Sequence, residues 1–487
     1  MNSSLKKNFL YNELYQILVI IIPLITSPYV TRVVGAEQLG IYSFTQSYAN
    51  YFVLFVLLGV NNYGNREIAR ARDNREQVNK VFSEIYSLQA IMLVIVLSVY
   101  ALATPFFIKD SASIYWLQIL MVFAAGFNIN WCCFGLEKFR LTVIRNSIIK
   151  ILSAVLIFAF VHSPSDLWIY TFILAGSTLL SQIVIWPFIL KELTFVRPSL
   201  KDILKHVKPN LMLFLPVLAV SMYNIMDKLM LGIIDTNSEI AFYHYAGKLT
   251  EIPETFITAL GTVMLPRAAN MISNGREIET KKILRQSMQF VMCFSIGGAF
   301  GLCAIANDLV PWYYGSAFFR CTLFTMWLSP VVVLTSWNNV IRTQFVIPKG
   351  LDRIYLITVS SGAIVNLVLN VIFIRVYHGI GAVIATLIAQ TVVCIVQFIL
   401  TRKFLDFNKY VSDSWPFIFA GASMMLVIQL ISKSVDFKPL IKILFEIVIG
   451  ISIYGACSLL YLIKMKKDTG FIQALLSVLS RRKKNGA

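Results

Sequence analysis

Apolar segments long enough to cross a membrane recur along the whole chain, and they limit what it can fold into. Crossing the ~30 Å hydrocarbon core takes about 20 helical residues, and fourteen segments approach or exceed that length. Charged residues make up only 14% of the 487 positions, which leaves little chain for a soluble domain. The sequence therefore predicts an all-α integral membrane protein with about 14 transmembrane helices. The predicted spans are residues 12–34, 39–63, 82–108, 113–136, 144–161, 167–190, 210–234, 239–264, 287–308, 318–347, 354–376, 380–401, 415–432 and 441–463.

Basic residues gather in alternate loops and predict the orientation of these spans. Lys and Arg follow the even-numbered spans and lie near both ends of the chain, whereas the other loops are short and hold few of them. Because cytoplasmic loops carry the excess of Lys and Arg, we expect both termini in the cytoplasm. The net charge of +18 then needs no nucleic acid as a partner, since topology and membrane lipids account for it. The first apolar segment lacks a small-residue cleavage site, so we expect it to stay as a helix.

Two parts of the chain begin alike, which indicates an internal repeat. Residues 23–42 and 216–243 both place a Pro early in one span and open the next with a polar–aliphatic–small–apolar–Tyr pattern. Transporters often contain such repeats, with the substrate site between them near the midplane. We therefore expect two six-helix lobes around a central cavity, plus two C-terminal helices. The expected parts are an N-terminal lobe at 1–191, an inter-lobe linker at 192–209, a C-terminal lobe at 210–410, spans 13 and 14 at 411–464, and a basic cytoplasmic tail at 465–487.

The predicted span 239–264 carries three charged residues at membrane depth. Lys248, Glu251 and Glu254 are spaced three residues apart, so they share one broad face of the helix. Lys248 lies about 13 Å from the outer end of the span, since a helix rises about 1.5 Å per residue. Ionisable residues at this depth are costly and mark substrate or ion pathways. An internal Lys248–Glu251 ion pair that only holds helices together explains the same pattern, and the sequence does not choose between the two.

Three more charged residues lie nearer the outer ends of their spans. Asp227 and Lys228 are adjacent and point about 100° apart on a helix, so they cannot both face one neighbour. Lys228 could reach the interface with its long stem, whereas Asp227 cannot. This contrast favours a protein or ion partner for Asp227. Arg32 lies three residues from the end of the first span, where a place in the cavity and one at the interface both stay open.

Patterns typical of enzymes and metal centres are absent from the sequence. No GxxxxGK[ST] phosphate loop, HExxH motif or paired-cysteine motif occurs, so we predict neither a nucleotide-driven pump nor a metal site. The seven cysteines are odd in number and mostly fall inside spans, where free Cys acts as a small packing residue. We therefore expect a protein that is not an enzyme and needs no cofactor.

Short motifs in a fixed order carry a resemblance to one transporter family. They cover roughly residues 10–405 and comprise Pro23–Gly40, Tyr63–Ala69, Asp227–Gly232, Phe242–Lys248, Leu265–Arg267, Ile347–Gly350, Asn366 with Asn370, and Gly379–Ala382. In their order and spacing the chain resembles the bacterial polysaccharide transporters. These are the Wzx-type flippases of O-antigen and capsule repeat units, within the multidrug/oligosaccharidyl-lipid/polysaccharide exporter superfamily.

The resemblance implies a substrate and a direction of transport. The substrate would be an undecaprenyl-diphosphate-linked sugar repeat, moved from the cytoplasmic to the outer leaflet of a bacterial plasma membrane for surface polysaccharide synthesis. Because a diphosphate cannot cross hydrocarbon unaided, Lys248, Arg32 and Lys228 would offset its charge in the cavity. Polysaccharide polymerase and chain-length machinery are partners that this role implies.

Transport would proceed by alternating access of the two lobes. Coupling to a proton or sodium gradient would use Glu251, Glu254 or Asp227, and nothing in the sequence selects the ion. The chain departs from the family at Gly247 and Gln390, where acidic residues are expected, which puts ion coupling at those two positions in doubt.

Two other classes of protein stay open at this stage. An ion-coupled small-molecule antiporter of the multidrug type would favour an acidic cavity for cationic drugs, and the mixed Lys and Glu content of span 239–264 argues mildly against it. A membrane enzyme such as a polysaccharide polymerase or acyltransferase would be expected to hold polar, Arg-bearing outer loops. The outer loops here are short.

Overall fold

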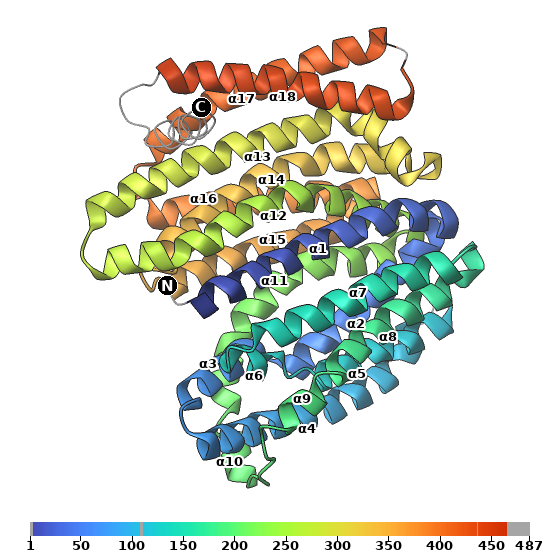
Figure 1. The fold of residues 1–487 in the computed structure, drawn as a ribbon. Helices are drawn as coiled ribbons and strands as arrows, with labels where there is room; N and C mark the ends of the chain where they lie inside the picture. The colour runs from blue at the N-terminus through green and yellow to red at the C-terminus, as the bar shows by residue number, and fades with distance from the viewer. Residues whose placement is uncertain (1–2, 108–110, 436, 465–487) are drawn as a thin grey trace, which may run out of the picture. The chain divides into compact units, whose positions relative to one another are not determined.

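Helices form nearly all of the structure (Figure 1). The computed structural model describes residues 3–107, 111–435 and 437–464, and no strand occurs in these ranges, so the predicted all-α class is confirmed. Ten helices in this part of the chain are long and apolar enough to cross a membrane, and a shorter apolar helix covers Leu18–Val34. Helices α11, α12 and α14 cover the remaining predicted spans, and the number of fourteen stays a prediction. The predicted basic tail at 465–487 lies outside the described residues.

The chain divides into two compact units, residues 1–241 and 242–487. Unit 1 holds α1 (Ser3–Val34), α2 (Ala36–Leu57), α3 (Val60–Ala71), α4 (Arg75–Phe107), α5 (Ala112–Gly126), α6 (Asn130–Gly135), α7 (Phe139–Phe160), α8 (Leu167–Ile183), α9 (Trp186–Leu190), α10 (Leu200–Leu204) and α11 (Val207–Ile234). Unit 2 holds all but the start of α12 (Asn237–Ser273), with α13 (Glu277–Tyr314), α14 (Cys321–Ile341), α15 (Asp352–Tyr377), α16 (Gly379–Thr401), α17 (Phe407–Ser434) and α18 (Pro439–Lys464). The lobe bounds expected from the sequence stay predictions.

Three predicted spans of unit 1 are helices in two pieces. The span at 39–63 breaks after α2, where Leu58 adopts φ 45°. The span at 113–136 breaks between α5 and α6, and the span at 167–190 breaks between α8 and α9. The buried Gln89 amide donates to the carbonyls of Ala125 (2.7 Å) and Asn128 (3.0 Å) at the second break. Because lipid offers no partner for a freed carbonyl, this side chain makes the break tolerable.

Helix α2 packs tightly against the end of α11 and the start of α12 within unit 1. A Cβ atom on Gly40 would lie 1.7 Å from the carbonyl oxygen of Asn237, and one on Gly232 would lie 1.9 Å from the Phe44 ring. Side chains at either position would push the two segments apart. Gly40, the last residue of the motif Pro23–Gly40, is therefore required for this packing.

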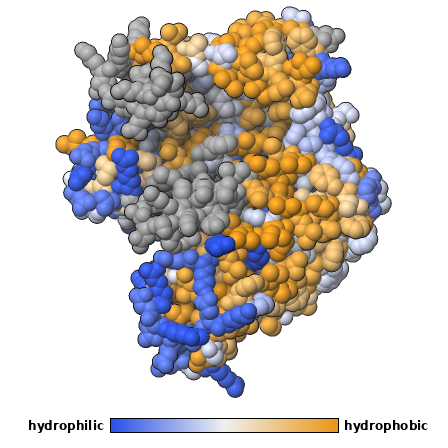
Figure 2. Space-filling model, in the orientation of Figure 1, coloured by the Kyte–Doolittle hydropathy of each residue, from blue (hydrophilic) through white to orange (hydrophobic). Residues whose placement is uncertain are grey.

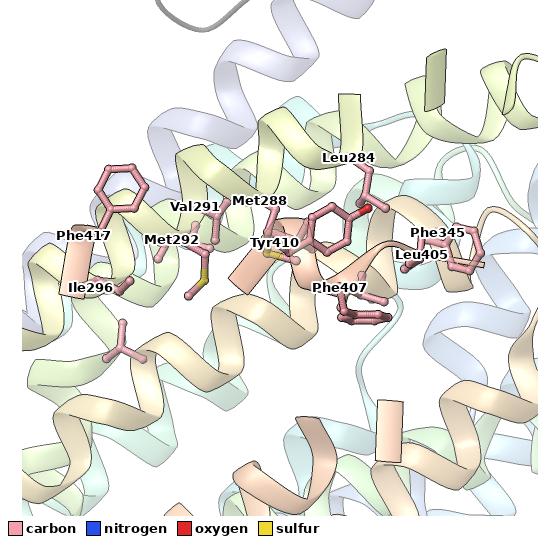
Figure 3. Close-up of a cluster of buried hydrophobic side chains, with 14 of the residues drawn as sticks. Leu284, Met288, Val291, Met292, Ile296, Phe345, Leu405, Phe407, Tyr410 and Phe417 are labelled. Carbon is pink, nitrogen blue, oxygen red and sulfur yellow. The ribbon is translucent and has the colours of Figure 1, made fainter. Parts of the chain in front are cut away.

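The apolar core of unit 2 lies between α13 and α17 (Figure 3). One face of α13 presents apolar residues at helical spacing toward aromatic residues of α17. The α13 residues are Leu284, Met288, Val291, Met292 and Ile296, and those of α17 are Phe407, Tyr410 and Phe417. This packing joins α17 and α13 firmly within unit 2.

Apolar side chains also cover the outside of both units, as orange surface in Figure 2 shows. On α7 of unit 1, Ile148 and Val155 are more than half exposed, and on α18 of unit 2, Ile451 and Leu460 are 69% exposed. Soluble proteins rarely expose apolar surface on this scale. The chain is therefore a multi-pass membrane protein whose helices face lipid.

Candidate functional site

The six residues predicted for the site fall into two sets of three, one in each unit. Arg32, Asp227 and Lys228 belong to unit 1, and Lys248, Glu251 and Glu254 belong to unit 2. Within unit 2 the three charges line one helix, α12.

Lys248 of α12 lies over an aromatic ring that is itself held in place. Its ammonium nitrogen is 4.7 Å from the centroid of the Tyr245 ring, which is the geometry of a cation–π contact. Tyr245 is 2% exposed, packs edge-on against Tyr314 and Phe318, and accepts a hydrogen bond at its carbonyl from the Tyr314 hydroxyl (3.0 Å). A positive charge is thus fixed on a rigid base, while the Lys248 side chain stays half-buried.

The two acidic residues of α12 differ in their surroundings. The Glu254 carboxylate is half-buried and accepts a hydrogen bond from the Thr335 hydroxyl of α14 (3.1 Å). Glu251, one turn earlier, is exposed within the described structure. The Glu254 carboxylate therefore links α12 to α14, whereas the Glu251 carboxylate is accessible to a ligand beside α12.

Sequence reasoning missed a polar face of α14 that continues from Thr335. Asn339 lies against Gly261 of α12, where an added Cβ would be 2.7 Å from its Oδ1 atom. Gln344 is 1% exposed and lies in a π-helical turn at Arg342–Val346. Among the described residues, neither the Asn339 oxygen nor the Gln344 amide has a hydrogen-bond partner. Buried amides without partners are rare, and π-turns often occur at functional sites. The signal in the sequence was the spacing of Thr335, Asn339 and Gln344 in an apolar segment.

In unit 1 the adjacent residues Asp227 and Lys228 have different environments, as their 100° separation predicts. Asp227 is 1% exposed, and its carboxylate interacts electrostatically with the Tyr51 hydroxyl of α2. Among the described residues that hydroxyl, which is also buried, has no hydrogen-bond partner. Lys228 is half-buried. Asp227 is thus the more deeply buried of the two, and its role as a site residue stays a prediction.

Arg32 is exposed, and its guanidinium donates to the carbonyl of Pro28 one turn earlier (2.9 Å). This bond folds the side chain back along α1. Arg32 belongs to unit 1, whereas the charged residues of α12 belong to unit 2.

A buried relay of charged and polar side chains in unit 1 also escaped sequence reasoning. The Glu84 carboxylate of α4 faces the His206 Nε2 atom (2.8 Å) and accepts a hydrogen bond from Lys205 (2.9 Å), and the Tyr63 hydroxyl of α3 lies 2.7 Å from His206 Nδ1. Glu84 is 1% and His206 5% exposed. The relay joins the segment before α11 to α3 and α4, in the stretch predicted as a linker.

The same stretch is held along α4 by further polar contacts. The backbone N–H of Thr194 donates to Asn79 (3.0 Å), and that of Val196 donates to Ser83 (2.9 Å). The Ser199 hydroxyl caps α10, and its hydrogen bond to Asp202 lowers the pKa of that carboxyl. The predicted linker is therefore an ordered part of unit 1.

No group of three or more potential metal ligands occurs within the described residues. All seven cysteines are free thiols, and six of them are at least half-buried. These thiols act as apolar packing residues.

Relatives of known name match most of the chain. The "Putative O-antigen transporter" of Escherichia coli (strain K12) is 24% identical over 82% of this chain and 97% of its own length. The protein of the same name from Shigella dysenteriae is 28% identical over 81% of this chain and 99% of its own length. Both alignments run almost from end to end of the relative.

Solved structures show that the fold is shared more widely. The lipid II flippase MurJ in an inward closed conformation superimposes with a TM-score of 0.75 at 16% identity, over 93% of this chain and 99% of MurJ. An inward-facing multidrug resistance MATE transporter of the MOP superfamily gives 0.61 at 15% identity, over 80% of this chain and 94% of the transporter. At these identities the likeness concerns the fold alone.

A family model described as "Polysaccharide biosynthesis protein" matches residues 5–272, which is more than half of the chain. The match includes all of the site residues proposed from the sequence. This chain belongs to the polysaccharide biosynthesis protein family.

Proposed function

We propose that the protein is a flippase for undecaprenyl-diphosphate-linked oligosaccharide repeat units in surface polysaccharide synthesis. It would move them from the cytoplasmic to the outer leaflet of a bacterial plasma membrane. The family match and the near full-length relatives named as O-antigen transporters support this role. The observation in the structure that carries it is Lys248, a cation held on a rigid aromatic ring in a membrane helix.

The chemistry of the substrate explains why such a cation is useful. The diphosphate is the part of the molecule that hydrocarbon excludes most strongly. Near the midplane a positive charge attracts it far more strongly than in water, because the surroundings have a low dielectric constant. Lys248 is the proposed main contact, with Arg32 and Lys228 contributed by unit 1. The exposed Glu251 and the amides along α14 offer hydrogen-bonding groups for sugar hydroxyls.

The proposed arrangement is two lobes, 1–191 and 210–410, around a central cavity that opens alternately to each side. Residues 192–209 would connect the lobes, and the last two spans would be an appendage to the second lobe. The loops rich in Lys and Arg would face the cytoplasm together with both termini. Polysaccharide polymerase and chain-length machinery would act on the product.

Return of the empty transporter would be coupled to a proton or Na⁺. The candidates are Asp227, which is buried, and Glu254, which is bonded to Thr335, with Glu251 as the exposed alternative. A carboxyl that is buried and has a neutral partner can change charge without breaking an ion pair. Glu254, bonded to the Thr335 hydroxyl, fits that requirement better than the exposed Glu251. Asp227 remains a candidate because it is buried.

Deletion of the gene in its host tests the role directly. The expected result is that lipid-linked repeats are assembled but stay in the cytoplasmic leaflet, and that surface polymer is lost. The alternatives predict other outcomes. A multidrug antiporter would leave surface polymer intact and sensitise cells to cationic drugs, and a polymerase would leave single repeats in the outer leaflet.

A further inference from the structure

A cavity of about 440 Å³ lies at one end of α13 and α17 in unit 2, and none of the α12 charges lines it. Every residue that lines it carries a polar or charged group, although the cavity adjoins the apolar core shown in Figure 3. The lining residues are Lys281, Lys282, Arg285, Gln286, Gln289, Asp406, Lys409 and Tyr410. These include four cations and one carboxylate.

Two of the four cations have acidic partners. Arg285 donates to the buried Asp413 carboxylate through two nitrogens (2.6 and 2.9 Å). Lys409 pairs with Asp406 (2.7 Å), and this bond lowers the pKa of the Asp406 carboxyl. Among the described residues Lys281 and Lys282 have no such partner. The cavity therefore keeps a positive charge that its own carboxylates do not balance.

Neutral donors complete the lining. Gln289 is only 7% exposed and is one of the residues that line the cavity. Tyr410 is 4% exposed, and Figure 3 shows its hydroxyl turned toward Leu284, at the edge of the core. A buried amide that faces a positively charged cavity is suited to an anionic oxygen.

The cavity continues into an apolar stripe on α13. Lys282, Gln286, Phe290 and Phe294 follow one another at intervals of four residues, so they lie along one face of the helix. The Phe290 and Phe294 rings are 4.6 Å apart, and Phe294 is 56% exposed. This face of α13 is therefore charged at one end and apolar at the other, which matches an amphiphilic ligand with an anionic headgroup and an apolar chain.

We propose that this cavity binds the phosphate of an anionic phospholipid, whose acyl chain lies along the α13 stripe. Lys281 and Lys282 would pair with the phosphate, and Gln289 would donate to one of its oxygens. The end of α13 and α17 that holds the cavity is the one that we place in the cytoplasm, where anionic headgroups attract basic segments. A soluble nucleotide or peptide would not need the exposed aromatic stripe. The site is independent of the flippase role, since it requires only that α13 and α17 cross the membrane.

Lipid binding by the full-length protein in neutral detergent tests the proposal. The probes are phosphatidylglycerol, phosphatidylcholine with the same acyl chains, and inorganic phosphate. Native mass spectrometry gives the dissociation constants. We expect phosphatidylglycerol to bind at least about tenfold more tightly than phosphatidylcholine, since only the former carries net charge.

Two variants and a matched control locate the site. Lys281→Gln/Lys282→Gln should weaken phosphatidylglycerol binding roughly 30-fold, at about one order of magnitude or less for each lysine. Gln289→Leu should weaken it roughly fivefold through loss of one hydrogen bond. Arg402→Gln/Lys403→Gln removes the same charge from exposed positions of unit 2 that do not line the cavity, and should change binding less than about threefold.

Several outcomes would overturn the proposal. Equal losses in the control and in the lysine variant would mean that diffuse surface charge attracts the lipid. Equal affinity for the two lipids would show that the net charge of the lipid does not matter for binding. If inorganic phosphate binds and lipid does not compete with it, the cavity binds free phosphate and the proposed acyl-chain contact is wrong. Equal melting temperatures of all variants in phosphatidylcholine show that the changes in binding do not arise from misfolding.

Discussion

The buried relay of unit 1 and the charged face of α12 in unit 2 use similar residues under opposite conditions. In the relay, Glu84 and His206 are buried, and each is within hydrogen-bond distance of two partners. On α12, Lys248 is half-buried over an aromatic ring, Glu251 is exposed, and Glu254 has one neutral partner. The first set is shut away inside the protein, whereas the second is accessible to a ligand at the exposed Glu251 and the half-buried Lys248.

This difference separates structural from functional charges better than membrane depth does. A buried charge that is fully paired stabilises one arrangement, and removing one partner leaves the other uncompensated. A charge that a substrate or an ion can reach is able to respond to it. Glu84 should therefore act through folding, and the α12 residues should act through transport.

Glu84→Ala is expected to have the largest effect on stability. It would strand the buried His206 and leave a void, at a cost of about 4 kcal/mol in the free energy of unfolding. Thermal unfolding of the purified protein measures this loss. Glu192→Ala is the matched control, since Glu192 pairs with Lys138 at an exposed site and should cost less than about 1 kcal/mol. Equal losses in the two variants would contradict the view that the relay is structural.

Lys248→Ala should reduce transport by roughly 100-fold without loss of abundance, since it removes a charged contact to the diphosphate. Lys248→Arg should restore part of the activity, because the charge is kept while the geometry changes. The measurement is transfer of labelled lipid-linked repeats to the outer leaflet, with membrane abundance as the reference.

The double variant Lys248→Ala/Glu251→Ala separates substrate binding from a structural ion pair. If the pair only holds the helix, Lys248→Ala alone should lower abundance, and the double variant should recover both abundance and transport. Such recovery would contradict the proposed contact between Lys248 and the diphosphate. Normal abundance with no transport in both variants would support it.

Gly40→Ala should destabilise unit 1 by about 2 kcal/mol, because the new methyl group would meet the Asn237 carbonyl and force the helices apart. Gly176→Ala in α8 is the control, since nothing lies within 4 Å of the added Cβ there and alanine favours the helix. Thermal unfolding of both variants distinguishes the two. A loss as large at Gly176 would show that the effect arises from the glycine itself rather than from close packing.

The sequence predicted the helical class and most helix positions, because membrane spans follow from local composition. It could not predict the breaks at Leu58 and near Gly126, since each depends on a backbone angle or on a distant side chain such as Gln89. The charges of α12 were found because charged residues are conspicuous in an apolar segment. Their neighbours Asn339 and Gln344 are neutral and were missed.

Residues distant in sequence were beyond reach for the same reason. Glu84 and His206 are 122 positions apart, and nothing local to either indicates the other. The cavity at Lys281 and Lys409 likewise joins the first turns of α13 and α17, which charge patterning could only describe as basic. This cavity forms only when α13 packs on α17, so neither segment alone indicates it.

Thr335→Val should have the smallest effect, and it tests whether Glu254 belongs with the functional charges. The change keeps the shape of the side chain but removes the donor to Glu254, so transport should fall by less than about tenfold and stability by about 1 kcal/mol. Thr358→Val is the control, since within the described part of the chain the buried Thr358 hydroxyl bonds only to the Ile354 carbonyl of its own helix (2.7 Å). If Glu254 couples transport to an ion, Thr335→Val should alter the dependence of transport on pH or on Na⁺, whereas Thr358→Val should not. A Thr335→Val protein with unchanged ion dependence and a loss of stability like that of Glu84→Ala would move Glu254 to the structural group.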